Sequence, residues 1–173
     1  MPVRQTVSDA FEMAIATERA AEVFYEALHD RFAAHEAVAT FWHSYALEEA
    51  GHAQRLRRVR ENLSVTDLSL EADPELLEMA RWNMSLAQKV SSAEIQTLED
   101  AYQLAHEIEH SEVNTVFELL VAGYSEDAHA LALVRNQLGE HIDRLMTGFP
   151  APFDVPETRR AVRPVGRDSV GYA

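Results

Sequence analysis

One helical stretch near the middle of the chain places charged residues where an apolar core should lie. Read at spacings of three and four, it forms a single helix face made of Val38, Trp42, Tyr45, Glu49, His52, Leu56, Val59 and Leu63. The face is apolar at both ends, whereas Glu49 and His52 occupy its middle. Side chains three positions apart on a helix have Cβ atoms about 5–6 Å from each other, so this pair can reach one metal ion. Because a buried carboxylate and imidazole need a charged partner, we predict a metal site inside a helical bundle.

The rest of the chain contains few residues that interrupt helices. Its 173 residues include only six glycines and six prolines, and the prolines other than Pro2 and Pro74 lie at 150–164. This composition predicts an all-α protein. We expect one bundle domain over residues 1–148, followed by an extended tail over residues 149–173 that contains proline and arginine.

Charge and cysteine content exclude several classes of function. The net charge of −14 repels nucleic acid and anionic lipid and attracts cations, so no nucleic-acid or membrane partner is expected. The chain has no cysteine, which excludes disulfides and thiolate metal sites within it. There is neither an apolar stretch of signal-peptide length at the N-terminus nor a run long enough to span a membrane, and we expect a cytoplasmic protein.

Two further helices also carry acids on apolar faces. The first is predicted to begin at Ser8 as its N-cap and to place Glu18 inward, on the face Phe11, Ala14, Glu18, Ala21, Tyr25, Leu28 and Phe32. The other is predicted to begin near Thr97 and to present the face Leu98, Tyr102, Ala105, Glu109, Glu112, Val116 and Leu119. Glu107 and His110 form an alternative pair, but Glu107 lies about 160° around the helix from Glu109. The apolar residues favour Glu109 and Glu112.

The last predicted helix offers His141 on a face with Leu138 and Leu145. Glu140 and Asp143 are an alternative pair, but turning them inward would turn both leucines outward. Between the ligand-bearing helices, residues 74–90 carry Leu76, Met79, Trp82, Met84 and Leu86 without a ligand-like spacing. We interpret this segment as a connecting helix that covers the bundle or meets a second subunit, and a homodimer is expected.

These motifs resemble the rubrerythrin branch of the ferritin-like superfamily. The resemblance depends on Ala14-Ile15-Ala16-Thr17-Glu18 with Phe24-Tyr25, on Glu49-x-x-His52, and on Ala105-His106-Glu107-Ile108-Glu109-x-x-Glu112, and it covers roughly residues 8–148. It implies an antiparallel four-helix bundle holding two iron ions that react with peroxide or oxygen. The implied ligands are Glu18, Glu49, His52, Glu109, Glu112 and a Glu-x-x-His of the last helix, here represented by His141. Tyr25 matches a tyrosine near the metals, which implies a catalytic role.

Three features depart from the family's pattern. Leu138 stands where the second bridging glutamate is expected, and Phe117 stands where a second tyrosine is common. The absence of cysteine means that the rubredoxin module of full rubrerythrins is missing, so electrons must come from an external donor protein.

Three functions follow from these observations. The first is a non-haem, di-iron oxidoreductase that reduces peroxide or oxygen, with manganese or zinc as other metals that the same ligands suit. The alternative is an iron-binding or iron-handling protein with an incomplete site and no peroxidase turnover, which Leu138 favours. A helical interaction module whose acids are merely solvated is the third, and it predicts no stabilisation by added metal.

Overall fold

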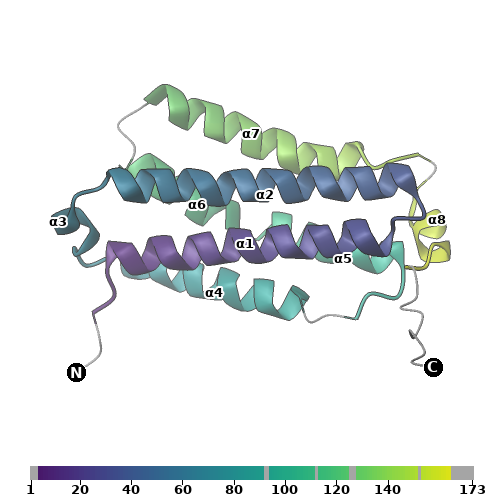
Figure 1. Ribbon diagram of the computed structural model, residues 1–173, viewed down its shortest axis with the longest axis horizontal. Helices are drawn as coiled ribbons and strands as arrows, with labels where there is room; N and C mark the ends of the chain where they lie inside the picture. Colours follow the sequence, from purple (N-terminus) through teal and green to yellow (C-terminus); the bar gives the residue numbers. More distant parts are fainter. Residues whose placement is uncertain (1–3, 92–93, 112, 125–127, 152, 165–173) are drawn as a thin grey trace, which may run out of the picture.

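The computed structural model describes residues 4–91, 94–111, 113–124, 128–151 and 153–164 of the chain (Figure 1). The described residues fold into helices and form no sheet, which confirms the predicted all-α, ferritin-like bundle. The helices are α1 Val7–Arg31, α2 Glu36–Asn62, α3 Val65–Leu68, α4 Pro74–Ser91, α5 Leu98–Glu109, α6 Val113–Tyr124, α7 Ala128–Thr147 and α8 Pro156–Ala161. None of these helices combines the length and the apolar character needed to cross a bilayer.

The two longest helices, α1 and α2, lie side by side along the whole molecule (Figure 1). The N-cap of α1 is Thr6 and not the predicted Ser8, which lies inside the helix. Thr6 forms a capping box with Asp9: its hydroxyl accepts from the Asp9 amide at 3.3 Å, and its own amide donates to Asp9 Oδ2 at 2.6 Å. These hydrogen bonds to Thr6 hold the pKa of Asp9 below its usual value. The residue three after Ser8 is Phe11, which cannot complete a capping box, so the helix is capped by Thr6.

Helix α4 is packed against α1 and α6, so it covers the bundle (Figure 1). Of the large apolar residues in this segment, Leu76 and Leu86 are buried, whereas Trp82 is 63% exposed and Met79 and Met84 are only partly buried. The buried residues are Leu76, Leu77, Ala80, Asn83, Leu86, Ala87 and Val90. The small alanine side chains on this face allow α4 to approach α1 closely. The alanine face is therefore buried, and the larger Trp82 is left exposed.

The predicted third helix is interrupted between α5 and α6. Helix α5 ends at Glu109, and the chain turns at His110 and Ser111 before α6 begins at Val113. The Ser111 hydroxyl donates to the Ile108 carbonyl at 2.6 Å, and the Asn114 amide donates to the Glu109 carbonyl at 3.2 Å. These side chains satisfy carbonyl groups that a continuous helix would bond internally.

The interruption changes which residues of α6 face the core. Leu119, predicted on the inward face, is 46% exposed, and its neighbour Leu120 is fully buried instead. The helix start predicted near Thr97 is confirmed. Thr97 is the N-cap of α5, where it forms a capping box by exchanging hydrogen bonds with Asp100.

The segment after residue 148 was expected to be extended, but it contains α8 and folds back onto α5. Its backbone joins the bundle where the Leu98 amide donates to the Val162 carbonyl at 3.0 Å. Arg159 is buried and donates to Glu99 at 2.6 Å. Residues 165–173 lie outside the described residues, and the predicted boundary at residue 148 stays a prediction.

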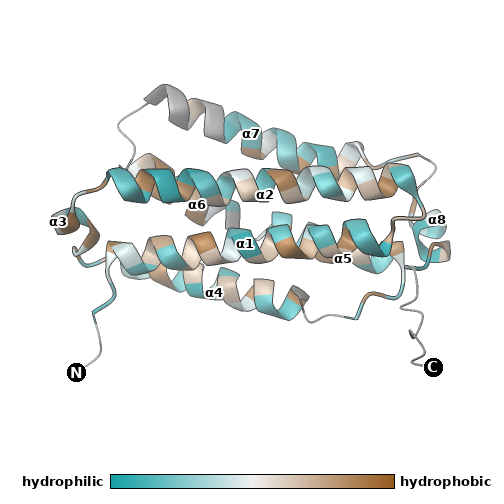
Figure 2. Ribbon diagram, viewed as in Figure 1, coloured by the Kyte–Doolittle hydropathy of each residue, from teal (hydrophilic) through white to brown (hydrophobic). Residues whose placement is uncertain are grey.

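The core consists of two separate apolar clusters. The tail cluster lies toward α8 and includes Phe24, Tyr25, Leu28, Trp42, Tyr45, Tyr102, Ile108, Leu145 and Phe149. The N-terminal cluster includes Val7, Phe11, Ala14, Leu56, Leu77, Val116, Phe117, Leu120 and Leu138. Figure 2 shows hydrophobic and hydrophilic residues interspersed along α1, α2 and α4, as expected for helices with one buried side.

Candidate metal centre

Between the two apolar clusters lies a belt of buried ionisable side chains. Glu18 separates the two clusters along α1, and Glu49 with His52 separates them along α2. Glu109 ends α5, and His141 lies in α7 between Leu138 of one cluster and Leu145 of the other. Three of these residues, Glu18, Glu49 and Glu109, are carboxylates only 2–3% exposed. The structure therefore brings together five of the six metal ligands predicted from the sequence.

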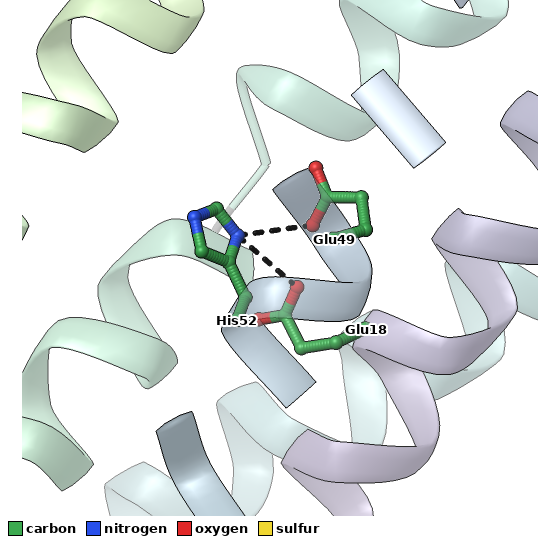
Figure 3. A group of neighbouring side chains, drawn as sticks. All are labelled: Glu18, Glu49 and His52. Carbon is green, nitrogen blue, oxygen red and sulfur yellow. Dashed lines mark hydrogen bonds and ion pairs between the residues drawn. The ribbon is translucent and has the colours of Figure 1, made fainter. Parts of the chain in front are cut away.

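The first group consists of Glu18, Glu49 and His52, from α1 and α2 (Figure 3). The Nδ1 atom of His52 lies 3.1 Å from Glu49 Oε2 and 3.8 Å from Glu18 Oε2. Both carboxylates lie toward the same nitrogen of the imidazole ring (Figure 3). The ligand atoms are close enough to one another for a single cation to contact all three.

The second group consists of Glu49, Glu109 and His141, from α2, α5 and α7. The Nε2 atom of His141 lies 2.9 Å from Glu109 Oε2 and 3.1 Å from Glu49 Oε1. Glu49 therefore belongs to both groups, with Oε2 toward His52 and Oε1 toward His141. A carboxylate placed in this way can bridge two cations.

Two buried atoms of the belt have no hydrogen-bond partner among the described residues. They are Glu18 Oε2 and His141 Nε2. His141 Nε2 is close to two carboxylate oxygens, yet it is not aligned to donate a hydrogen bond to either. Buried polar atoms are rarely left unpaired in native proteins. Their convergence, and the cost of burying three carboxylates together, fit ligands that face metal ions.

Protonation partly balances the charge of the belt in the metal-free protein. Burial raises the pKa of Glu18 to about 8, and the charge of Glu49 adds to this rise while His52 opposes it. Burial alone would lower the pKa of His52, but the carboxylates of Glu18 and Glu49 raise it to about 10. Burial alone would raise the pKa of Glu49, but the nearby imidazoles of His141 and His52 hold it below its usual range.

Tyr25, for which the resemblance implies a catalytic role, contacts this belt through Glu109. Its hydroxyl donates to Glu109 Oε1 at 2.5 Å. Burial raises the pKa of Tyr25 well above its ordinary value, and the nearby charges of Glu109 and Glu49 raise it further. The phenol therefore keeps its proton and holds one oxygen of Glu109, which leaves Oε2 facing His141.

The model of the rubrerythrin family matches residues 9–135. This chain belongs to the rubrerythrin family. The match spans Glu18, Glu49, His52 and Glu109 and ends before His141, so the inclusion of His141 depends on its helix face and its position in the structure and not on the family match. No match was found among curated proteins or among solved structures.

Three positions of this family member bear on how complete the site is. Glu112, predicted as a ligand, lies outside the described residues. Leu138 is 6% exposed and packs in the N-terminal cluster, so the position three before His141 is apolar. Phe117 packs beside His52, with ring centroids 4.8 Å apart, where the family pattern commonly has a tyrosine.

An outer pair of charges, which the sequence did not reveal, orients His141. Glu48 Oε2 accepts from His141 Nδ1 at 2.5 Å, and Arg144 donates to both Glu48 oxygens at 2.6 and 2.8 Å. Burial alone would raise the pKa of Glu48, but hydrogen bonds from His141 and Arg144 lower it to about 2. Because Nδ1 is held by Glu48, Nε2 is the atom that faces Glu49 and Glu109.

Replacing Glu48 with methionine is expected to weaken metal binding at the group that contains His141. Loss of an outer hydrogen-bond partner of a ligating histidine typically lowers metal affinity about 10- to 100-fold. Metal titration of the purified variant measures this loss. Glu140→Met is the control, since Glu140 lines the same surface cavity as Glu48 and His141 but is exposed. Equal affinities for Glu48→Met and the unaltered chain would show that Glu48 does not orient His141.

A cavity of about 320 Å³ opens beside this part of the belt. It lies along α2 and α7 and is lined by Glu48, Gly51, His52, Arg55, Gln137, Glu140, His141 and Arg144. A liquid water molecule occupies about 30 Å³, so the cavity is large enough to bring a small polar molecule to the two histidines.

Proposed function

We propose that this protein is a non-haem, di-iron oxidoreductase that reduces peroxide or oxygen with electrons from an external donor protein. The observation that carries this proposal is the position of Glu49, whose two oxygens face two different ligand groups. A single shared carboxylate keeps two cations close enough to act on one small molecule.

The donor set supports iron. Each group offers one imidazole nitrogen with carboxylate oxygens, which suits iron and also manganese or zinc, and the chain has no thiolate to offer. Three carboxylates with two neutral imidazoles carry three negative charges, so one divalent cation leaves a net charge of −1 and two leave +1. The predicted ligand Glu112 would supply the fourth carboxylate that neutralises two divalent cations.

Two ferrous ions would supply the two electrons that, with two protons, reduce hydrogen peroxide to two water molecules. The chain's own residues hold and orient the ligands around them. Tyr25 holds a proton on its hydroxyl and fixes Glu109, while Glu48 fixes His141. The two apolar clusters exclude water from both ends of the belt, and the cavity beside His52 and His141 is the route that a small oxidant would take.

Metal binding is expected to release protons and to strengthen as pH rises. The pKa of His52 is raised to about 10 and that of Glu18 to about 8, so both hold a proton at pH 7 in the metal-free protein. Metal binds the deprotonated forms and must displace these protons. Affinity should therefore increase between about pH 6 and pH 8. Calorimetric titration in buffers of different ionisation enthalpy measures the released protons, and a pH-independent affinity would contradict this expectation.

The proposed reaction is tested by loading the protein anaerobically with Fe²⁺ and mixing it rapidly with hydrogen peroxide. We expect stoichiometric oxidation of bound iron, followed by repeated turnover only when an external reductant is present. Peroxide that leaves the bound ferrous iron unoxidised would refute the reductase. Catalase-like release of oxygen without a reductant would also count against it.

The alternative is an iron-binding protein without turnover, and the burial of Leu138 favours it. An apolar side chain three before His141 leaves the second group without the additional carboxylate implied by the family pattern. In that case iron would bind and oxidise once, and the rate of re-reduction by small reductants would be negligible. The homodimer also stays a proposal, to be measured by light scattering of the purified protein.

A further inference from the structure

Asn83 is a buried polar residue on the inward face of α4. It is 1% exposed and lies one turn from Ala80 and from Ala87, among otherwise apolar buried residues of this helix. The pattern parallels Glu18 and Glu49, which are also polar residues on apolar faces. Helix α4 packs directly against α1, the helix that carries Glu18.

The Oδ1 atom of Asn83 has no hydrogen-bond partner among the described residues. Asn83 shares a narrow cavity with Glu18 and Thr17, and apolar residues of α1, α4 and α6 form its remaining lining. The cavity is too small to hold a water molecule, so no water satisfies the amide there. The Thr17 hydroxyl already donates to the Met13 carbonyl at 3.0 Å.

Glu18 is therefore the one ionisable group in the cavity that Asn83 lines. Its Oε2 atom is also buried without a hydrogen bond among the described residues, and it lies 3.8 Å from His52 Nδ1. By contrast, Glu109 is held by Tyr25 and His141 is held by Glu48. Among the described residues no such outer hydrogen bond reaches Glu18 Oε2, and Asn83 carries the other unpaired atom of the same cavity.

We propose that Asn83 is a positioning residue for Glu18: its amide donates a hydrogen bond to the Glu18 carboxylate and holds it toward His52 and Glu49. Rotation of the amide by 180° places Nδ2 where Oδ1 lies, which supplies the donor. An unpaired buried amide lowers stability, and residues that break a local rule in this way concentrate at functional sites. The inference rests on the proposed metal-binding function, and it assigns Asn83 to only one of the two metal positions.

The test compares Asn83→Leu with the unaltered protein in anaerobic Fe²⁺ titrations. Leucine has a similar size and suits the apolar face of α4. We expect the variant to bind one of its two ions about 10- to 100-fold more weakly, as is typical when an outer partner of a ligand is lost. Thr17→Val is the matched control, because it alters the same cavity by one polar group and leaves Asn83 intact. It should bind both ions as tightly as the unaltered chain does.

Thermal unfolding of the metal-free proteins separates positioning from packing. Asn83→Leu should unfold at about the same temperature as the unaltered chain, because burial of the apolar leucine offsets the lost hydrogen bond to Glu18. If Asn83→Leu does not fold, Asn83→Ala takes its place, since alanine already stands at positions 80 and 87 of this face and cannot donate the hydrogen bond. That variant should also bind one ion more weakly.

Unchanged iron affinity in the folded variants, or a loss matched by Thr17→Val, would overturn the proposal. A lower unfolding temperature of metal-free Asn83→Leu with unchanged affinity would assign Asn83 to packing alone. Failure of the unaltered protein to bind Fe²⁺ would instead refute the proposed function itself, so the two failures are distinguishable.

Discussion

Replacing Glu49 with glutamine is expected to remove the ability of the chain to hold two metal ions. The Oε2 atom of Glu49 faces His52 and the Oε1 atom faces His141, so one substitution alters both groups. Glutamine keeps the shape of the side chain but loses the negative charge that both cations need. Metal analysis after anaerobic loading and desalting measures the effect. Glu26→Gln, on the exposed side of α1, is the control and should retain full loading.

Metal analysis of variants of Glu18 and Glu109 tests whether Glu49 is shared between the two groups. Glu18→Gln and Glu109→Gln should each weaken one metal position and leave the other occupied, because each acid belongs to a single group. If Glu49→Gln lost no more metal than either of these variants, Glu49 would not bridge the groups, and the two sites would be independent.

Replacing Arg159 with leucine is expected to lower the free energy of unfolding by about 3 kcal/mol, as is typical when one partner of a buried ion pair is removed. Arg159 is buried, and its Nε donates to Glu99 Oε2 at 2.6 Å while its Nη1 donates to the Asp154 carbonyl at 2.9 Å. Its guanidinium also lies over the Tyr102 ring, 3.9 Å from the centroid. The substitution leaves the buried Glu99 carboxylate without a charged partner, although Gln103 still donates to its Oε1 at 2.8 Å, and it removes contacts that hold α8 on α5.

Urea denaturation followed by circular dichroism measures this loss. Arg163→Leu is the control, because Arg163 is exposed and, within the part of the chain that the structure describes, donates a hydrogen bond only to the Gln96 carbonyl, at 3.2 Å. It should change stability by less than about 0.5 kcal/mol. Adding Glu99→Leu to Arg159→Leu should recover part of the loss, since it removes the stranded charge. A loss below about 1 kcal/mol for Arg159→Leu would show that the pair does not hold the tail on the bundle.

The ligand-bearing belt could be predicted from the sequence because each member interrupts an apolar helix face. Glu18 and Glu49 were found in this way, and so was His141, although the family match ends before it. Periodicity reports which side of a helix is buried, so a charged residue at such a position is informative without any tertiary model. The all-α class followed from the same periodicity and from the scarcity of glycine and proline.

Features that depend on contacts between distant segments could not be predicted. The interruption after Glu109 depends on which carbonyls Ser111 and Asn114 bond, and periodicity does not report this. Glu48 was not identified from the sequence, since its partners His141 and Arg144 lie more than 90 residues away in the chain.

Asn83 was missed for a different reason. Residues 74–90 show no ligand-like spacing, so nothing in the sequence marked Asn83, and the structure shows that it shares the buried face of α4 with Ala80 and Ala87. Close helix packing favours small residues, so the size of an apolar residue does not report which face of α4 is buried.

The central claim is that Glu49 holds two metal ions between the two groups of ligands. The most direct test is the iron content per chain of the unaltered protein after anaerobic loading with Fe²⁺ and removal of unbound metal. We expect two iron ions per chain, bound with a dissociation constant low enough to survive desalting. One iron ion per chain, or none, would contradict the shared role of Glu49.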